Sequence, residues 1–199
     1  MILPLERDEL LARREGWRHF AEDPALEKPQ SLSAKQIEKL SEDERVAYDY
    51  HRERYHANFL VTTPQVKRLN VRLWDLLDAN QQGPSRVKGA AIIDSPPGLG
   101  KTTAVDAFGR AFHRRQILRH GKDFDDGQTL HIPVCHVAFK GNTTTRALNE
   151  AILNFYNHPS SDAAQTRYLR NRNLATLAAE SVRRHGTRLI IVADVLYDR

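Results

Sequence analysis

The chain has 199 residues and is 40% hydrophobic, which suits one sizeable core, or one core with a helical appendage. No apolar run is long enough to span a bilayer, and residues 6–9 are all charged where a signal peptide is apolar. A cytoplasmic protein without a membrane partner is therefore predicted. The only cysteine, Cys135, excludes a disulfide framework or a cysteine-rich zinc site within one chain, and its apolar neighbours predict that it lies in the core.

The formal net charge of +5 is unevenly distributed along the chain. Residues 1–60 hold 10 Lys and Arg against 13 Asp and Glu, whereas residues 61–199 hold 20 against 12. The cations form three clusters: Arg110, Arg114, Arg115, Arg119 and Lys122; then Arg167, Arg170 and Arg172; then Arg183, Arg184 and Arg188. Such clusters suit contacts with polynucleotide phosphates. They equally suit solvated helix faces and helix C-termini, where cations are favourable.

The first part of the chain, residues 1–82, is predicted to be a polar helical region. A charged helix is expected over residues 5–20, followed by helices that start with capping boxes at Ser33 and Ser41. Another helix begins at Thr62-Thr63-Pro64, and its apolar face is expected to pack against the core. A turn at residues 81–85 ends this region.

Residues 83–199 alternate between predicted strands and helices. Strands are expected at 89–94, 130–139 and 188–194, and helices after residue 101, after Thr143, Thr144 or Thr145, and from residue 161 or 166 to a stop at Gly186. This alternation predicts an α/β fold with a parallel sheet of about three strands and right-handed crossovers. A ligand is expected at the carboxyl ends of the strands.

The most informative motif lies between Ala90 and Thr103, where an apolar run leads into a glycine-containing loop and a helix. The pattern G-x-x-x-x-G-K-[ST] surrounds a β-phosphate with loop N–H groups, while its lysine reaches the β/γ oxygens and its hydroxyl holds Mg²⁺. The alternative is a Gly-Pro turn that only starts a helix. The residues predicted to bind ATP and Mg²⁺ are Ser95 (which replaces the first glycine), Pro96, Pro97, Gly98, Leu99, Gly100, Lys101, Thr102 and Thr103.

Asp194, at the end of the last predicted strand, is the candidate for metal binding and for catalysis. In nucleotide hydrolases an acid at such a position holds Mg²⁺, and an adjacent acid orients the attacking water. If Asp194 holds the metal, the catalytic position falls on Val195. If Asp194 is the catalytic acid, the metal position falls on Ala193. In both registers one acid of the pair is missing.

Taken together, these motifs resemble the AAA+ branch of P-loop ATPases and, more narrowly, the transposon-associated ATP-binding helper proteins of the TniB type. The resemblance covers roughly residues 45–195 and depends on residues 92–103, on residues 132–134 with 143–153 after them, and on residues 188–195. It implies a three-layer α/β/α P-loop domain that binds ATP, forms homo-oligomers on duplex DNA and helps a transposase.

The sequence also departs from that family. The segments expected to carry a polar sensor, an arginine finger and a helical lid do not follow Asp194, so an incomplete domain with weak or absent ATP hydrolysis is expected. The alternative function is a nucleotide-sensing protein-interaction module without turnover, and a small-molecule kinase is a more distant third. Duplex DNA binding that depends on ATP distinguishes the first two.

The remaining polar and aromatic candidates favour structural roles. His131 and His136 are expected on opposite faces of one strand, which disfavours a joint metal site. His113 and His120 lie among arginines and are expected on a solvated basic helix. The aromatic residues Trp17, Tyr48, Tyr50, Tyr55 and Trp74 are interpreted as core residues rather than as platforms for stacking bases.

Overall fold

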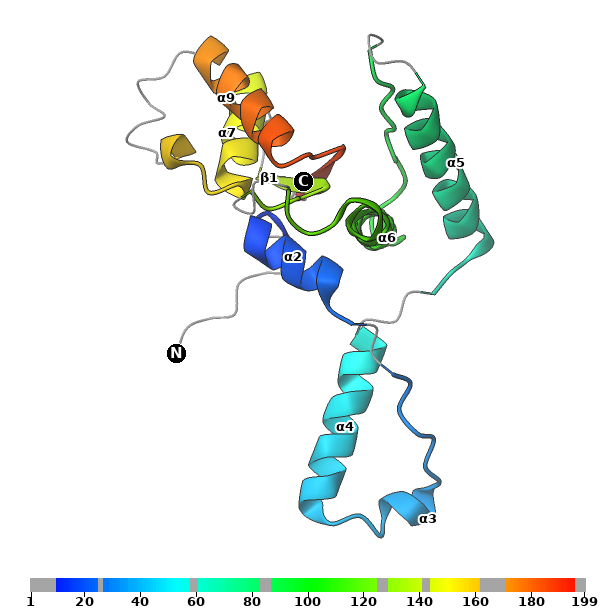
Figure 1. Ribbon diagram of the computed structural model, residues 1–199. Coiled ribbons are helices and arrows are strands. Elements are labelled where there is room, and N and C mark those ends of the chain that lie inside the picture. The colour runs from blue at the N-terminus through cyan, green and yellow to red at the C-terminus, as the bar shows by residue number, and fades with distance from the viewer. Residues whose placement is uncertain are drawn as a thin grey trace. The chain divides into compact units, whose positions relative to one another are not determined.

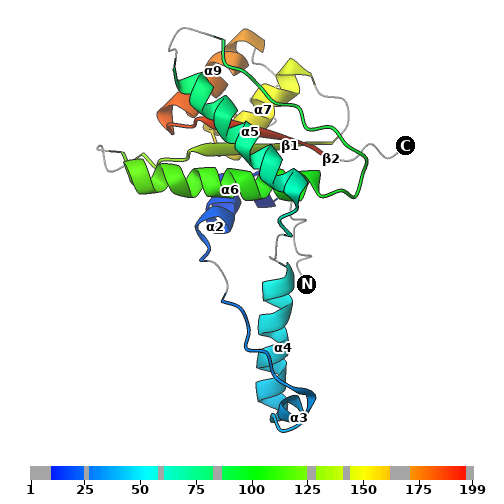
Figure 2. The same cartoon turned by 90° about the vertical axis from the view of Figure 1, so that its right-hand side faces the viewer.

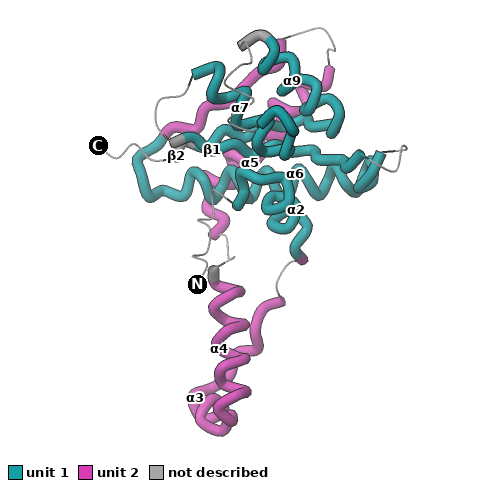
Figure 3. Tube along the Cα trace, turned by 90° about the vertical axis from the view of Figure 1, so that its left-hand side faces the viewer, with its two compact units in different colours: residues 1–23, 95–199 teal, residues 24–94 magenta. Residues whose placement is uncertain are grey.

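The computed structural model describes residues 10–24, 27–57, 61–82, 87–124, 129–140, 144–161 and 171–195. The chain divides into two compact units, one of residues 1–23 and 95–199 (unit 1) and one of residues 24–94 (unit 2) (Figure 3). The sequence places a single boundary near residue 82. In the structure, the start of the chain instead belongs with the C-terminal part, because Trp17 and Ala21 are buried there.

The sheet of unit 1 consists of β1 (Val134–Lys140) and β2 (Leu189–Val195), which run parallel (Figure 1). Their register runs from Val134 opposite Leu189 to Lys140 opposite Val195. They are connected through α7 (Thr145–Phe155), the 3₁₀ turn η1 (Pro159–Ser161) and α9 (Asn171–Arg184). The predicted mixed α/β class with parallel strands is confirmed.

Helices pack on both faces of this sheet, which explains why residues 134–137 of β1 are all buried. On one face lies α7, whose C-terminal Tyr156 is hydrogen-bonded to Cys135; burial raises the pKa of the Cys135 thiol to about 12. The opposite face carries α6 (Lys101–His120), because a Cβ on Gly109 would lie only 2.5 Å from the Ile191 side chain of β2. Cys135 is a core residue, as predicted.

The short helix α2 (Arg14–Glu22) also lies on the α6 face of the sheet (Figure 2). Its Trp17 is fully buried, stacks on the His136 ring of β1 at 5.5 Å, and lies against Gly109 of α6. The prediction of a core position is confirmed for Trp17 but wrong for Tyr50, which is 61% exposed; Tyr48, Tyr55 and Trp74 are only half-buried. The part of the expected helix that falls on residues 1–9 lies outside the described residues.

Unit 2 contains α3 (Ala34–Ile37), α4 (Glu42–Ala57) and α5 (Pro64–Gln81). The predicted caps are confirmed: the Ser33 N–H donates to Gln36 at 2.8 Å, the Ser41 N–H donates to Glu44 at 2.8 Å, and Thr63 accepts from the Val66 N–H at 3.2 Å. None of the described residues of unit 2 is buried, so its helices are defined by their caps rather than by a core.

The predicted strand at residues 89–94 is wrong for this structure. Residues 87–96 form neither helix nor strand, and Ile92 is 94% exposed. A strand exists only when its backbone groups pair with a neighbour, and here Gly89 pairs with a side chain instead: its N–H donates to Asn80 Oδ1 at 2.7 Å, and its carbonyl accepts from Asn80 Nδ2 at 2.9 Å. The described sheet has two strands rather than about three.

The strand expected over 130–139 begins later, at Val134, because the preceding residues pair elsewhere. Leu130 forms an isolated bridge with Asp123, and the His131 N–H donates to the Lys122 carbonyl at 2.8 Å. The strand expected over 188–194 and the helix stop at Gly186, which has a positive φ of 62°, are confirmed. The acidic segment 121–127 also predicts a turn, and its residues 125–127 lie outside the described residues.

Candidate functional site

The loop from Ser95 to Gly100, called the glycine loop below, leads directly into α6. Gly98 and Gly100 have φ values of +79° and +76°, in the left-handed region that favours glycine. Apart from their chain neighbours, none of the described residues has an atom within 4 Å of the position that a Cβ would take at either glycine. Backbone conformation therefore explains the two glycines, and the space beside them is open to a ligand.

Ser95 departs from the geometry expected of a first loop glycine. Among the described non-glycine residues only Asn157 has a positive φ, so Ser95 occupies ordinary backbone space. A serine is tolerated at this position because the left-handed conformations of the loop fall on Gly98 and Gly100 instead.

The N-terminus of α6 is uncapped by side chains. Gly100 is the N-cap residue, no side chain accepts a hydrogen bond there, and the helical ladder starts with the Ala104 N–H donating to the Gly100 carbonyl at 2.9 Å. The first N–H groups of a helix lack intrahelical acceptors and carry a partial positive charge, which suits an anion. Thr102 and Thr103 are exposed in this first turn.

Lys101 turns back over the glycine loop. Its Nζ donates to the Ser95 carbonyl and, at 3.2 Å, to the Pro96 carbonyl. The two carbonyl oxygens therefore accept hydrogen bonds from the lysine ammonium group, which in the sequence pattern donates to phosphate oxygens. The ammonium group therefore lies over the loop and needs only a side-chain rotation to leave the carbonyls for a more strongly charged acceptor.

The glycine loop lies at the carboxyl ends of the strands, as the sequence predicts. At the opposite edge, just after α6, the Gly121 carbonyl is 2.9 Å from His131 Nδ1, and His131 precedes β1. Helix α6 consequently runs antiparallel to β1 and β2, with Lys101 toward the side where the strands end (Figure 2). Asp194 is near that end of β2, opposite Phe139 in the register, and its side chain lies outside the described residues.

The first basic cluster is largely engaged within unit 1. Arg110 donates to the Asp23 carbonyl at 2.6 Å, and Arg114 donates to the Ala21 carbonyl at 2.7 Å and also to that of Asp23. Cations at the carbonyl end of α2 neutralise its partial negative charge. For Arg110 and Arg114, therefore, the interpretation as helix C-terminal cations is the one that the structure supports.

The predicted position of His113 on a solvated basic helix is wrong. It is not on a solvated face: it is fully buried and accepts a hydrogen bond from the Trp17 indole N–H at 3.2 Å. Burial lowers the pKa of His113 to about 4. Residues 104, 108, 112 and 116 form a buried stripe along α6, and positions 109 and 113 lie on the same stripe. This helical periodicity was the signal in the sequence that could have predicted the burial of His113.

Among the described residues there is no group of three or more His, Cys, Asp or Glu side chains that could hold a metal ion. None of the helices in the described ranges is long and apolar enough to cross a membrane. Comparison of the chain with protein-family models, with curated proteins and with solved structures gave no match.

Proposed function

We propose that the chain binds ATP with Mg²⁺ through residues 95–103 and serves as a nucleotide-dependent helper in a DNA transaction such as transposition. The observation that carries the nucleotide part is the glycine loop, which joins two left-handed glycines, an uncapped 20-residue helix and the Lys101 ammonium at one place. In this proposal Lys101 holds the β/γ-phosphates, Thr102 ligates Mg²⁺, and the backbone N–H groups surround the β-phosphate.

The DNA part of the proposal is supported by cations at the opposite edge of unit 1. Arg183 and Arg184 end α9, Arg188 precedes β2, and Arg119 is near the end of α6; all four are exposed. These segments meet at the strand N-termini, because His185 Nδ1 is 3.0 Å from the Leu130 carbonyl and the Arg188 N–H donates to the Pro133 carbonyl at 2.9 Å. Exposed guanidinium groups gathered at one edge suit phosphate contacts.

The DNA interface is tested by titrating fluorescent duplex DNA with the full chain, with and without Mg-ATP, at several salt concentrations. Replacing Arg183 and Arg184 together by Gln should weaken binding and reduce the slope of log K against log salt by about 2. Replacing Arg68 and Arg72 of α5 by Gln removes the same charge from other exposed positions and should have little effect. Equal losses in the two double variants would contradict this interface.

A second function, a nucleotide-sensing protein-interaction module that does not bind DNA, is favoured by a different observation. Arg110 and Arg114 of the first basic cluster donate to α2 carbonyls, and Lys122 pairs with Glu22 at 2.7 Å. Those cations are occupied within unit 1. If the DNA titration shows no binding in either nucleotide state while nucleotide binding persists, this second function is the one to retain.

ATP hydrolysis by the chain is expected to be near background, with or without duplex DNA. Asp194 is flanked by Ala193 and Val195, so one acid of the pair that holds the metal and orients the water is missing. A positioned base contributes about 10²- to 10⁴-fold to such reactions. Phosphate release under multiple-turnover conditions measures this. Steady turnover that disappears in Lys101→Ala would contradict the expectation and make Asp194 the next residue to replace.

A further inference from the structure

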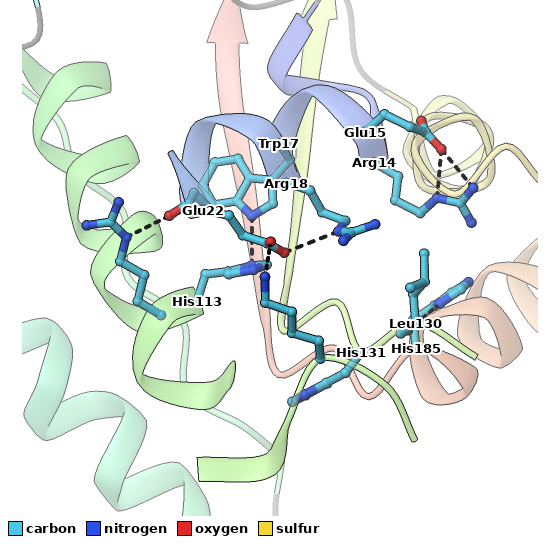
Figure 4. A network of polar contacts seen from close by, with 12 residues as sticks. Arg14, Glu15, Trp17, Arg18, Glu22, His113, Leu130, His131 and His185 are labelled. Carbon is cyan, nitrogen blue, oxygen red and sulfur yellow. Dashed lines mark hydrogen bonds and ion pairs between the residues drawn. The ribbon is translucent and has the colours of Figure 1, made fainter. Parts of the chain in front are cut away.

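A small group of buried polar side chains joins α2 to α6 and β1, and we call it the α2 seam. It consists of Trp17 of α2, Asp106 and His113 of α6, and His136 of β1. Each of these residues is at most 2% exposed. Figure 4 shows the Trp17 indole N–H pointing toward the His113 ring, with a dashed line for the hydrogen bond between them. Neither the proposed nucleotide site nor the proposed DNA surface uses these groups.

The hydrogen bond in the seam fixes the protonation of His113. The indole N–H of Trp17 is a donor only, and it lies 3.2 Å from His113 Nδ1. That nitrogen must therefore offer a lone pair. A second proton on the ring would place two donors against each other, and the other ring nitrogen, Nε2, is buried without a hydrogen-bond acceptor. Protonation thus removes one hydrogen bond and creates a buried cation whose Nε2 has no hydrogen-bond acceptor among the described residues.

The charged and titratable groups that act on His113 are Arg18 and Glu22 of α2, Arg114 of α6 and His131 ahead of β1. The other titratable groups of the seam, Asp106 of α6 and His136 of β1, lie 3.3 Å from each other. Burial is the largest influence and lowers the pKa of His113; Glu22 opposes it, whereas His131, Arg18 and Arg114 add to it. Glu22 is itself paired with Lys122 at 2.7 Å and with Arg18 at 3.3 Å, so its charge is shared. The surroundings therefore favour the neutral imidazole.

The C-terminal end of α2 makes a second set of contacts with α6. Arg110 and Arg114 donate to the carbonyls of Ala21 and Asp23. These contacts do not change between neutral and mildly acidic pH, because a guanidinium stays protonated. The bond between Trp17 and His113, in contrast, requires a neutral histidine.

We propose that the α2 seam is an acid-sensitive latch, which holds α2 on α6 while His113 is neutral and releases it when His113 takes up a proton. The sign follows from the two states of the chain. Unfolded His113 binds its proton near the ordinary value of 6.5, whereas the folded seam resists it down to about 4. Neutral His113 therefore stabilises the folded chain fully above the pKa that it has in the unfolded chain. This stabilisation is lost as the pH falls toward the pKa of His113 in the folded chain.

The test uses the full chain with Trp74→Phe, so that Trp17 is its only tryptophan. Urea unfolding is followed by Trp17 fluorescence at about pH 7.5 and about pH 5, where linkage for His113 alone predicts a roughly 30-fold loss in the ratio of folded to unfolded chain. In His113→Asn the side-chain oxygen still accepts from the indole but does not titrate. Between the two pH values, the ratio of folded to unfolded chain should fall about 30-fold less in this variant than in its parent.

His19→Asn is the matched control, because it removes one exposed histidine from the same helix, α2. It should keep the full pH dependence of the parent. If His113→Asn keeps the same dependence as His19→Asn, the latch is disproved, whatever the absolute stability of either variant.

If His113→Asn does not fold, the indole proton of Trp17 in the Trp74→Phe chain gives the answer by NMR. A resonance that shifts and loses its protection from exchange as the pH falls supports the latch. One whose shift and protection stay constant from about pH 7.5 down to below the folded pKa of about 4 overturns it.

Discussion

Replacing Lys101 by alanine is expected to lower the affinity of the chain for Mg-ATP by about 30-fold or more. The ammonium group is the only side-chain cation at the glycine loop among the described residues 95–103, and charge-assisted hydrogen bonds to phosphate contribute about 2 kcal/mol. The fold should survive, because the bonds lost are those to the carbonyls of Ser95 and Pro96 on the surface of the loop. Isothermal titration calorimetry with Mg-ATP and with ADP measures the change.

The matched control for this change is Arg119→Ala, which removes one exposed cation from the other end of the same helix, α6. It alters the net charge equally but lies at the edge of unit 1 opposite the glycine loop. Its affinity for Mg-ATP should equal that of the unmodified chain. Unchanged affinity in Lys101→Ala would remove the assignment of residues 95–103 to nucleotide binding, and an equal drop in both variants would attribute the effect to overall charge.

Replacing Trp17 by alanine is expected to destabilise unit 1 by about 3–5 kcal/mol. The indole is fully buried, stacks on His136 and fills the space against Gly109, so its removal leaves a cavity. It also leaves His113 Nδ1 buried without its donor. Urea unfolding followed by far-ultraviolet circular dichroism at neutral pH gives the free energy of unfolding.

Two further variants divide this effect into its parts. Trp17→Phe keeps a buried ring but loses the indole N–H, so it should cost about 1–3 kcal/mol, the penalty for an unsatisfied buried acceptor and a smaller ring. Trp74→Ala removes a half-buried tryptophan from α5, in unit 2, and should leave the unfolding of unit 1 nearly unchanged. If Trp17→Ala were no more destabilising than Trp74→Ala, α2 would not belong to the core of unit 1.

Features encoded within a few neighbouring residues were predicted well from the sequence. Thr144 caps α7 by accepting from the Ala147 N–H at 3.1 Å, and it is one of the three threonines expected there. The stop at Gly186 and the strand that follows it were expected because a left-handed glycine and an apolar run are local signals. The same holds for the glycine loop and the start of α6, whose residues are contiguous.

Features that depend on distant partners were not predictable in this way. Residues 89–94 have the composition of a buried strand, yet a strand requires a neighbouring backbone, and the Asn80 side chain takes the hydrogen bonds of Gly89 instead. His113 lies among arginines in sequence, but Trp17, 96 positions earlier, covers it. The burial of a side chain depends on which element packs against its helix face. The residues within a few helical turns of that side chain do not specify this distant partner.

The sequence by itself therefore determined the helix caps, the glycine loop and the order of the elements from α6 to β2, because these follow from backbone conformation and from the periodicity of neighbouring side chains. The tertiary structure alone decided that α2 joins unit 1, that Arg110 and Arg114 close the end of α2, and that a neutral histidine lies beneath Trp17. The physical reason is the same in each case: these contacts join residues about 90 positions apart, and burial and charge pairing between such residues arise only when the elements pack.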